Sequence, residues 1–132
     1  MDERLEKALE FSNYMITLTN QRTLLHEKFL EKCVHYVNGG KFSITKELIN
    51  FCYMMVSTDQ ESIILIDDNN SPIEIEELEN FLEDITSIYF TNTNEYLVAF
   101  NFIKKNRSVK GLLDIWQKGY YFLHLIIAKL II

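Results

Sequence analysis

Two long stretches of the chain place apolar residues at steps of three and four, the spacing of one face of an α-helix. The first stretch predicts a helix from about Asp2 to Val37. Asn38-Gly39-Gly40 is expected to end it, because glycine takes the left-handed conformation without penalty. The second predicts a helix from about Glu76 to Asn106. Arg22 interrupts the first apolar seam and Asn92 the second.

The length of the first predicted helix has a consequence for packing. At about 1.5 Å per residue it would extend for roughly 50 Å. That is more than the diameter of a compact domain of 132 residues. Part of its apolar surface is therefore expected to pack against another long helix, either in the same chain or in a second copy.

Shorter elements are expected between the two long helices. Lys41–Ile44 reads as an extended link, and Thr45 as the N-cap of a helix from Lys46 to about Ser57. Ser62–Asp67 is rich in β-branched residues and predicts a strand. A turn over Asp68–Pro72 would return the chain through Ile73–Ile75 as the second strand of a hairpin.

The pattern as a whole predicts a mainly α fold with a small β-hairpin, of the α+β class. Two long helices would pack as an antiparallel pair, with the short helix and the hairpin between them, and Ser108 would cap an apolar C-terminal helix. A chain of 132 residues fits one domain, which we assign to residues 1–132.

The last part of the chain, from Tyr120 to Ile132, is apolar nearly all round. A window opened at Leu112 is too polar for a convincing membrane span, because it includes Asp114 and Lys118. Three interpretations stay open. The segment is a buried helix that closes the core or an oligomer interface, or residues 117–132 form a membrane-associated tail, or the end is non-native and comes from a shifted or truncated reading frame.

Charge is segregated along the chain, whose net value is −6 at pH 7. Residues 61–95 carry ten acidic and no basic side chains, whereas residues 96–132 carry one acidic and six basic ones. The acidic start and basic end of the second long helix complement its macrodipole, which accounts for much of the asymmetry. Blocks of opposite sign also attract each other within the molecule or between copies.

The best-defined cationic patch follows the second long helix and comprises Lys104, Lys105, Arg107 and Lys110. Such a patch is a solvated helix junction, a docking site for an acidic protein surface, or a grip for the phosphates of a nucleic acid. We expect these four cations to meet acidic groups of a partner. Apolar anchors of the same interface are expected at Phe100, Ile103, Leu112 and Trp116.

Catalytic and metal-binding motifs are not apparent. The acidic run from Asp67 departs from a calcium loop, since the sixth position is Pro72 and the twelfth Leu78. Cys33 and His35 are two residues apart on a presumed helix and would point to different faces. Two cysteines without a disulfide framework suit a reducing, cytosolic-type compartment. We therefore expect that the protein is not an enzyme and that it has no cofactor and no metal site.

Three stretches of the sequence carry a resemblance: NGGKFSITKELINF, ILIDDNNSPIEIEELENFLEDI and YFTNTNEYLVAFNFIKKNRSVKGLLDI. Together they resemble small conserved proteins of unassigned role from contractile-tailed, myovirus-type bacteriophages, especially marine ones. The resemblance covers roughly residues 1–115, and the tail after Ile115 departs from it. It implies a phage-encoded protein located in the cytoplasm of the infected bacterial host or in the virion, and it transfers no functional residue.

These observations favour a non-enzymatic, phage-encoded protein that binds other proteins, as an assembly factor, scaffold or virion component, and that self-associates through its long helices. The alternative is a nucleic-acid-binding accessory or transcription-modulating protein that uses the 104–110 patch. A membrane partner depends on the C-terminal tail.

Overall fold

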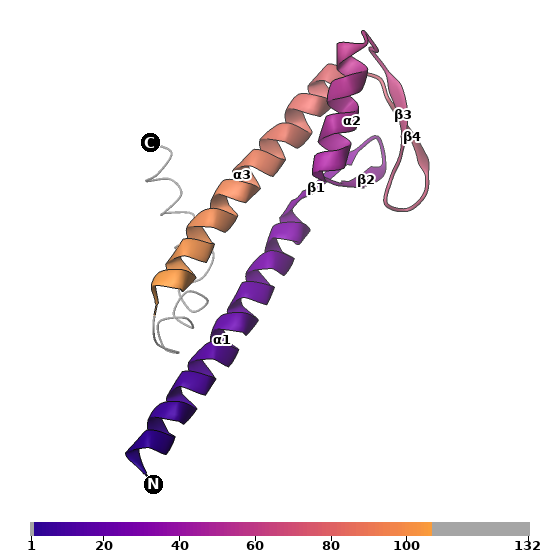
Figure 1. Cartoon of the computed structure of the whole chain (residues 1–132). Coiled ribbons are helices and arrows are strands. Elements are labelled where there is room, and N and C mark those ends of the chain that lie inside the picture. Colours follow the sequence, from indigo (N-terminus) through magenta and orange to yellow (C-terminus); the bar gives the residue numbers. More distant parts are fainter. Residues whose placement is uncertain (1, 107–132) are drawn as a thin grey trace. The chain divides into compact units, whose positions relative to one another are not determined.

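The structure is a computed structural model that describes residues 2–106 (Figure 1). Its described part is mainly helical with two small antiparallel hairpins, which confirms the predicted α+β class. The predicted C-terminal helix lies outside the described residues. The elements in chain order are α1 (Glu3–Lys32), β1 (Val34–Val37), β2 (Gly40–Ser43), α2 (Lys46–Ser57), β3 (Ile63–Ile66), β4 (Pro72–Ile75) and α3 (Leu78–Lys105).

These elements form two compact units. Among the described residues, the helix-pair unit comprises residues 2–28 and 94–106, and the hairpin unit comprises residues 29–93. Each of the two long helices contributes a segment to both units. Each unit therefore contains a segment of α1 and a segment of α3, which are far apart in the sequence. The assignment of residues 1–132 to one domain stays a prediction.

The end of the first helix differs from its prediction. Helix α1 ends at Lys32, and Val34–Val37, expected to be its last turn, form strand β1 instead. The expected link over Lys41–Ile44 supplies strand β2, which pairs with β1 in antiparallel register with Val37 opposite Gly40. Asn38 and Gly39 between them have φ angles of 50° and 79°. An Asn-Gly pair with both residues left-handed makes the tight turn of a two-residue hairpin rather than a helix cap.

The second hairpin is the one that the sequence predicts. Strands β3 and β4 pair with Leu65 opposite Ile73. The Asp67 N–H donates to the Ser71 carbonyl at 3.0 Å, and the Asn70 N–H donates to the Asp67 carbonyl at 3.1 Å. Asn70 has a φ of 61°. A turn followed by a left-handed residue is the usual three-residue hairpin connection.

The carboxylate of Asp67 ties the second hairpin to the first. Its Oδ1 accepts from the N–H groups of Ser71 at 2.8 Å and Asn69 at 3.0 Å, and its Oδ2 accepts from the Lys41 N–H of β2 at 3.1 Å. The Ser71 N–H contributes most to a lowered pKa of the Asp67 carboxyl, opposed by desolvation and assisted by the Lys41 and Asn69 donors. The ionised carboxylate therefore stabilises the contact between the hairpins.

Helix α2 begins as predicted. The Thr45 side chain accepts a hydrogen bond from the Leu48 N–H at 3.1 Å, which satisfies one of the free donors of the first turn. The helix runs over Lys46–Ser57 and places Cys52 in the core with no exposed surface.

The core of the hairpin unit joins both hairpins, α2 and the first half of α3. Phe42 of β2 and Phe81 of α3 meet edge to face with ring centroids 5.5 Å apart. Gly40 approaches Ile73 so closely that a Cβ on it would lie 2.7 Å from Ile73 Cγ1, so the first hairpin packs directly on the second. The buried members of this core are Cys33, Phe42, Ile44, Cys52, Leu65, Ile75, Leu78, Phe81 and Ile85.

The two long helices pair in opposite directions in the helix-pair unit, as predicted. The Tyr14 hydroxyl donates to the Asn106 carbonyl at 2.8 Å. Further along α1, the rings of His26 and Tyr96 lie 6.0 Å apart. Residue numbers thus rise along α1 as they fall along α3, which is the signature of an antiparallel pair.

Replacing Ile85 by alanine tests the core of the hairpin unit. Ile85 has no exposed surface, so Ile85→Ala should lower the free energy of unfolding by about 2–5 kcal/mol. Phe90→Ala on the same helix is the control, because Phe90 is largely exposed and its loss should cost less than about 0.5 kcal/mol. Urea unfolding followed by circular dichroism measures both. Equal effects of the two substitutions would contradict the assigned core.

Asp67→Asn tests the link between the hairpins. The folded-state pKa of Asp67 lies below its unfolded value of about 3.9. Its ionised form therefore adds stability above that pH, and the addition is lost as pH falls through the folded-state pKa. The urea midpoint of Asp67→Asn should lie below that of the wild type at pH 7, and the difference should shrink as the pH falls through the folded-state pKa of Asp67. Glu83→Gln, at an exposed position, is the control. A difference that does not change with pH would contradict the account.

Candidate functional site

The inner face of α1 in the helix-pair unit is a buried seam. Leu18 and Leu25 of α1 pack with Ala99 and Ile103 of α3, and all four are buried. Ile103, expected to anchor a partner, has no exposed surface. Its side chain belongs to the intramolecular core and is not offered to another molecule, so this part of the predicted interface is corrected.

The polar interruption of the seam is Gln21 rather than Arg22. Gln21 is 5% exposed, and its Oε1 has no hydrogen-bond partner in the described part of the chain. Arg22 lies outside the seam with its guanidinium carbon 5.2 Å from the centroid of the Phe100 ring. Phe100, another predicted anchor, is half-buried and already engaged by this cation–π contact.

The remaining predicted partner-binding residues are only partly visible. Lys104 and Lys105 are exposed in the last turn of α3, where cations complement the helix dipole. Arg107, Lys110, Leu112 and Trp116 lie outside the described residues, as does the apolar tail over 117–132. The predicted site as a whole therefore lies partly outside the described residues, and its role stays a prediction.

A second apolar series on α1 is exposed instead. Leu5, Leu9 and Ile16 are 51%, 46% and 58% exposed. Thr19 and Thr23 continue the series toward the C-terminal end of the helix, at steps of three and four residues. We call these five residues the outer stripe. Because each step matches one or two helical turns, the stripe runs along one side of α1, away from the Leu18–Leu25 seam.

The two threonines of the outer stripe have satisfied hydroxyls. The Thr19 hydroxyl donates to the Met15 carbonyl at 3.0 Å, and the Thr23 hydroxyl donates to the Thr19 carbonyl at 3.0 Å. The donor of each hydroxyl is therefore used inside the helix, and the methyl group is left for contact with a neighbour. A partner can thus cover the outer stripe without leaving these two hydroxyl donors without an acceptor.

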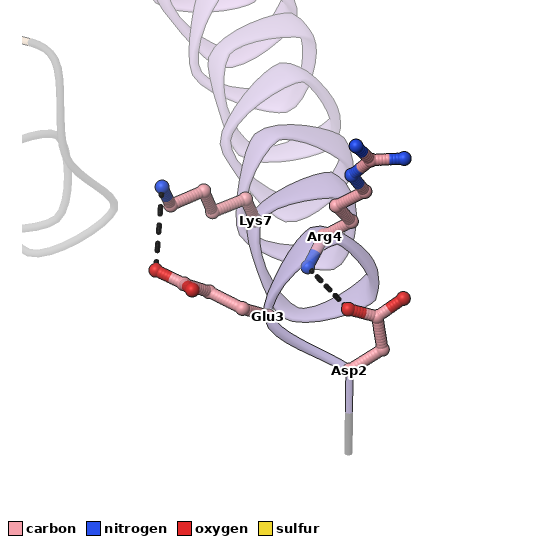
Figure 2. A network of polar contacts seen from close by, with 4 residues as sticks. All are labelled: Asp2, Glu3, Arg4 and Lys7. Carbon is pink, nitrogen blue, oxygen red and sulfur yellow. Dashed lines mark hydrogen bonds and ion pairs between the residues drawn. The ribbon is translucent and has the colours of Figure 1, made fainter.

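The start of α1 is held by local polar contacts (Figure 2). Asp2 Oδ1 accepts from the Arg4 N–H at 3.1 Å, which satisfies one free donor of the first turn. Lys7 Nζ lies 3.6 Å from Glu3 Oε1, one helical turn away. Such an exposed ion pair adds little stability. The helical conformation of the first turns of α1 therefore depends on this capping and on packing against their apolar residues.

A groove of about 630 Å³ lies beside the seam in the helix-pair unit. Its wall includes Phe11, which is 66% exposed, and the polar side chains of Lys7, Glu10 and Lys104. An apolar side chain in a charged rim suits contact with protein better than it suits chemistry on a small substrate.

Groups that could do chemistry are not gathered in the described part. Burial raises the pKa of the Cys52 thiol to about 11. Burial also raises the pKa of Cys33, against a hydrogen bond from the Asn92 side chain. Raised pKa values leave both thiols protonated and poorly nucleophilic at neutral pH. Within residues 2–106, no three His, Cys, Asp or Glu side chains lie close enough together to hold a metal ion.

Asn92, which breaks the apolar seam of α3, has a structural role. Its Nδ2 donates to the Lys32 carbonyl at 3.1 Å, at the last residue of α1. The side chain therefore satisfies a carbonyl of the helix end, which would otherwise need water or another donor.

No helix in the described part of the chain is long and apolar enough to span a bilayer. No family model matches the chain, and no match was found among curated proteins or solved structures. The outer stripe was missed in the sequence because the buried seam on the other side of α1 has a similar helical spacing. The signal was nevertheless there, as a second series of three-, four- and seven-residue steps from Leu5.

Gln21→Met tests the buried polar position of the seam. A methionine of similar length removes the unpaired oxygen and packs with its neighbours. The variant should be more stable than the wild type by about 1 kcal/mol, because a buried acceptor without a partner carries a desolvation penalty. Urea unfolding measures the change. A loss of stability on this substitution would mean that Gln21 Oε1 has a partner in the folded protein.

Proposed function

We propose that this chain is a non-enzymatic protein-binding protein that self-associates through the outer stripe of α1. The observation that carries the proposal is the exposure of Leu5, Leu9 and Ile16 along one side of a 30-residue helix. Exposed apolar residues that share one face mark interaction sites more often than single scattered ones do. Their helical spacing fits a partner that is itself a helix.

The charge of α1 supports a second copy as that partner. Glu3–Lys32 contains five acidic and five basic side chains, so no net charge opposes the approach of two such helices. The first ten residues are the more acidic part, whereas Arg22, Lys28 and Lys32 lie toward the other end. Two copies in antiparallel orientation would bring these regions together, and their helix dipoles would be favourably aligned.

The expected strength of this association is modest. Burying the exposed part of a leucine or isoleucine contributes about 1 kcal/mol. Three such residues in each of two copies give on the order of 6 kcal/mol, and association itself costs about 4–15 kcal/mol. The outer stripe alone therefore barely offsets the cost of association. Self-association at millimolar concentration or below, as proposed, requires further contacts between the two copies, such as those between the acidic and basic regions of α1.

The biological setting of the proposal comes from the resemblance to myovirus-type phage proteins of unassigned role. A phage protein of this kind would act in the infected bacterium or in the virion, as an assembly factor, scaffold or structural component. Reversible self-association through one helix face suits such a role, since assembly steps require subunits that can join and rearrange.

Ile16→Glu tests the self-association directly. A charge in the middle of the outer stripe should abolish the rise in weight-average mass with concentration that sedimentation velocity detects for the wild type. Leu24→Glu is the matched control, because Leu24 is 44% exposed on the same helix but lies outside the stripe.

Circular dichroism should show both variants folded. A wild-type chain that stays monomeric at millimolar concentration would contradict the proposal, and so would equal behaviour of the two variants.

A further inference from the structure

The free edge of strand β3 is a second surface that lacks a partner in the described part of the chain. In an antiparallel hairpin, alternate residues point their N–H and C=O groups toward the paired strand or away from it. The hydrogen bond from the Asp67 N–H to the Ser71 carbonyl closes the ladder. Counting from it in the observed register, Leu65 bonds to β4, and Ile64 and Ile66 point outward. Within residues 2–106, no hydrogen bond reaches the outward groups of these two isoleucines.

The opposite edge of the hairpin is closed, which supports this assignment. Pro72 of β4 has no N–H to offer. The outward carbonyl of Glu74 is already taken, because Asn38 Nδ2 donates to it at 2.9 Å. Beyond Ile66 the outward Asp68 N–H already donates to the Lys41 carbonyl at 2.9 Å. The two edges thus differ, and an added strand would find its backbone partners at Ile64 and Ile66.

The side chains of the free edge are unusually apolar for an exposed strand. Ile64 and Ile66 are each 69% exposed, and they lie on the same face of the hairpin. β-Branched residues on an open edge are what a strand-forming partner contacts in β-augmentation, where main-chain bonds give affinity and alternate side chains give specificity.

Charge decides which partner fits. The hairpin unit, residues 29–93, has twelve acidic and three basic side chains, a net charge of −9. Glu61 precedes β3, Asp68 follows it, and Glu74 lies opposite Ile64. Two copies of so acidic a unit repel each other, which protects the edge from pairing with itself. A strand with lysine or arginine beside its apolar residues would be attracted to the same edge.

A groove lies at the end of the hairpin away from its turn and adds to the match. It has a volume of about 550 Å³ and includes Glu61, Glu76, Glu77 and Glu79 in its wall. Basic side chains just beyond the added strand would enter it. We infer that the β3 edge binds an extended basic segment of another protein, in which lysine or arginine alternates with β-branched residues. This inference does not depend on the self-association of α1.

The test uses the full chain and synthetic peptides of about nine residues, a typical strand length, in which lysine alternates with valine. Fluorescence anisotropy measures binding, and amide hydrogen exchange measures protection at Ile64 and Ile66. The lysine peptide should bind and slow exchange at both amides. A peptide with glutamate in place of lysine should not bind. An N-methylated lysine peptide, which keeps the charge but cannot form the ladder, should bind at least about tenfold more weakly because main-chain hydrogen bonds are lost.

Ile64→Pro makes the same test on the protein, because it removes one outward N–H without touching the bonds to β4. The substitution should weaken the binding of the lysine peptide about tenfold. Tyr53→Ser, at an exposed position of α2, should leave this binding unchanged. If Ile64→Pro does not fold, the N-methylated peptide decides alone. The inference would be overturned if the lysine peptide did not bind, or if the N-methylated peptide bound as tightly as the lysine peptide. It would also be overturned if the amides of Ile64 and Ile66 were already protected from exchange in the free protein, because this chain or a second copy would then occupy the edge.

Discussion

A long helix is stable in water only when packing covers its apolar face, and α1 of this protein has two such faces. The inner one, with Leu18 and Leu25, is covered by α3 of the same chain. The outer one, with Leu5, Leu9 and Ile16, is not covered by any residue that the structure describes. One intramolecular partner cannot shield both sides of a helix, because the two series lie on different sides of its axis. The proposed self-association rests on this geometric constraint.

Polar residues in the packed parts help to determine how the elements fit together, and some of them also add stability. Gln21 sits in the seam with an oxygen that none of residues 2–106 pairs, at a cost that an apolar residue would avoid. Asn92 makes a specific bond to the Lys32 carbonyl at the end of α1. Asp67 uses both carboxylate oxygens on backbone donors from two hairpins. A buried polar group has a limited number of positions in which it is satisfied, so Asn92 and Asp67 each disfavour alternative packings.

Much of the fold could be predicted from the sequence because its signals were local. Each of these signals comes from residues that are close together in the sequence. They are the Thr45 hydroxyl that caps α2, the turn after Asp67 and the spacing of three and four residues between apolar positions along α3. The first hairpin could not be found in the same way. Val34–Val37 continue the apolar spacing of α1, and Asn38-Gly39 suits both a helix end and a tight turn. The choice depends on Gly40 meeting Ile73 and on Lys41 meeting Asp67, contacts made with residues far along the chain.

The candidate site was harder to predict for a related reason. The spacing of apolar residues identifies the faces of a helix, but it does not say which of two faces will be buried. Ile103 of α3 was for this reason assigned to a partner, although it belongs to the core. The central claim is that a second copy covers the outer stripe. Methyl NMR with a soluble paramagnetic probe tests it most directly, at a series of protein concentrations. The account predicts that Leu5, Leu9 and Ile16 lose exposure to the probe as concentration rises, while Leu24 does not. Methyl groups equally exposed at every concentration, or shielded even at high dilution, would contradict it.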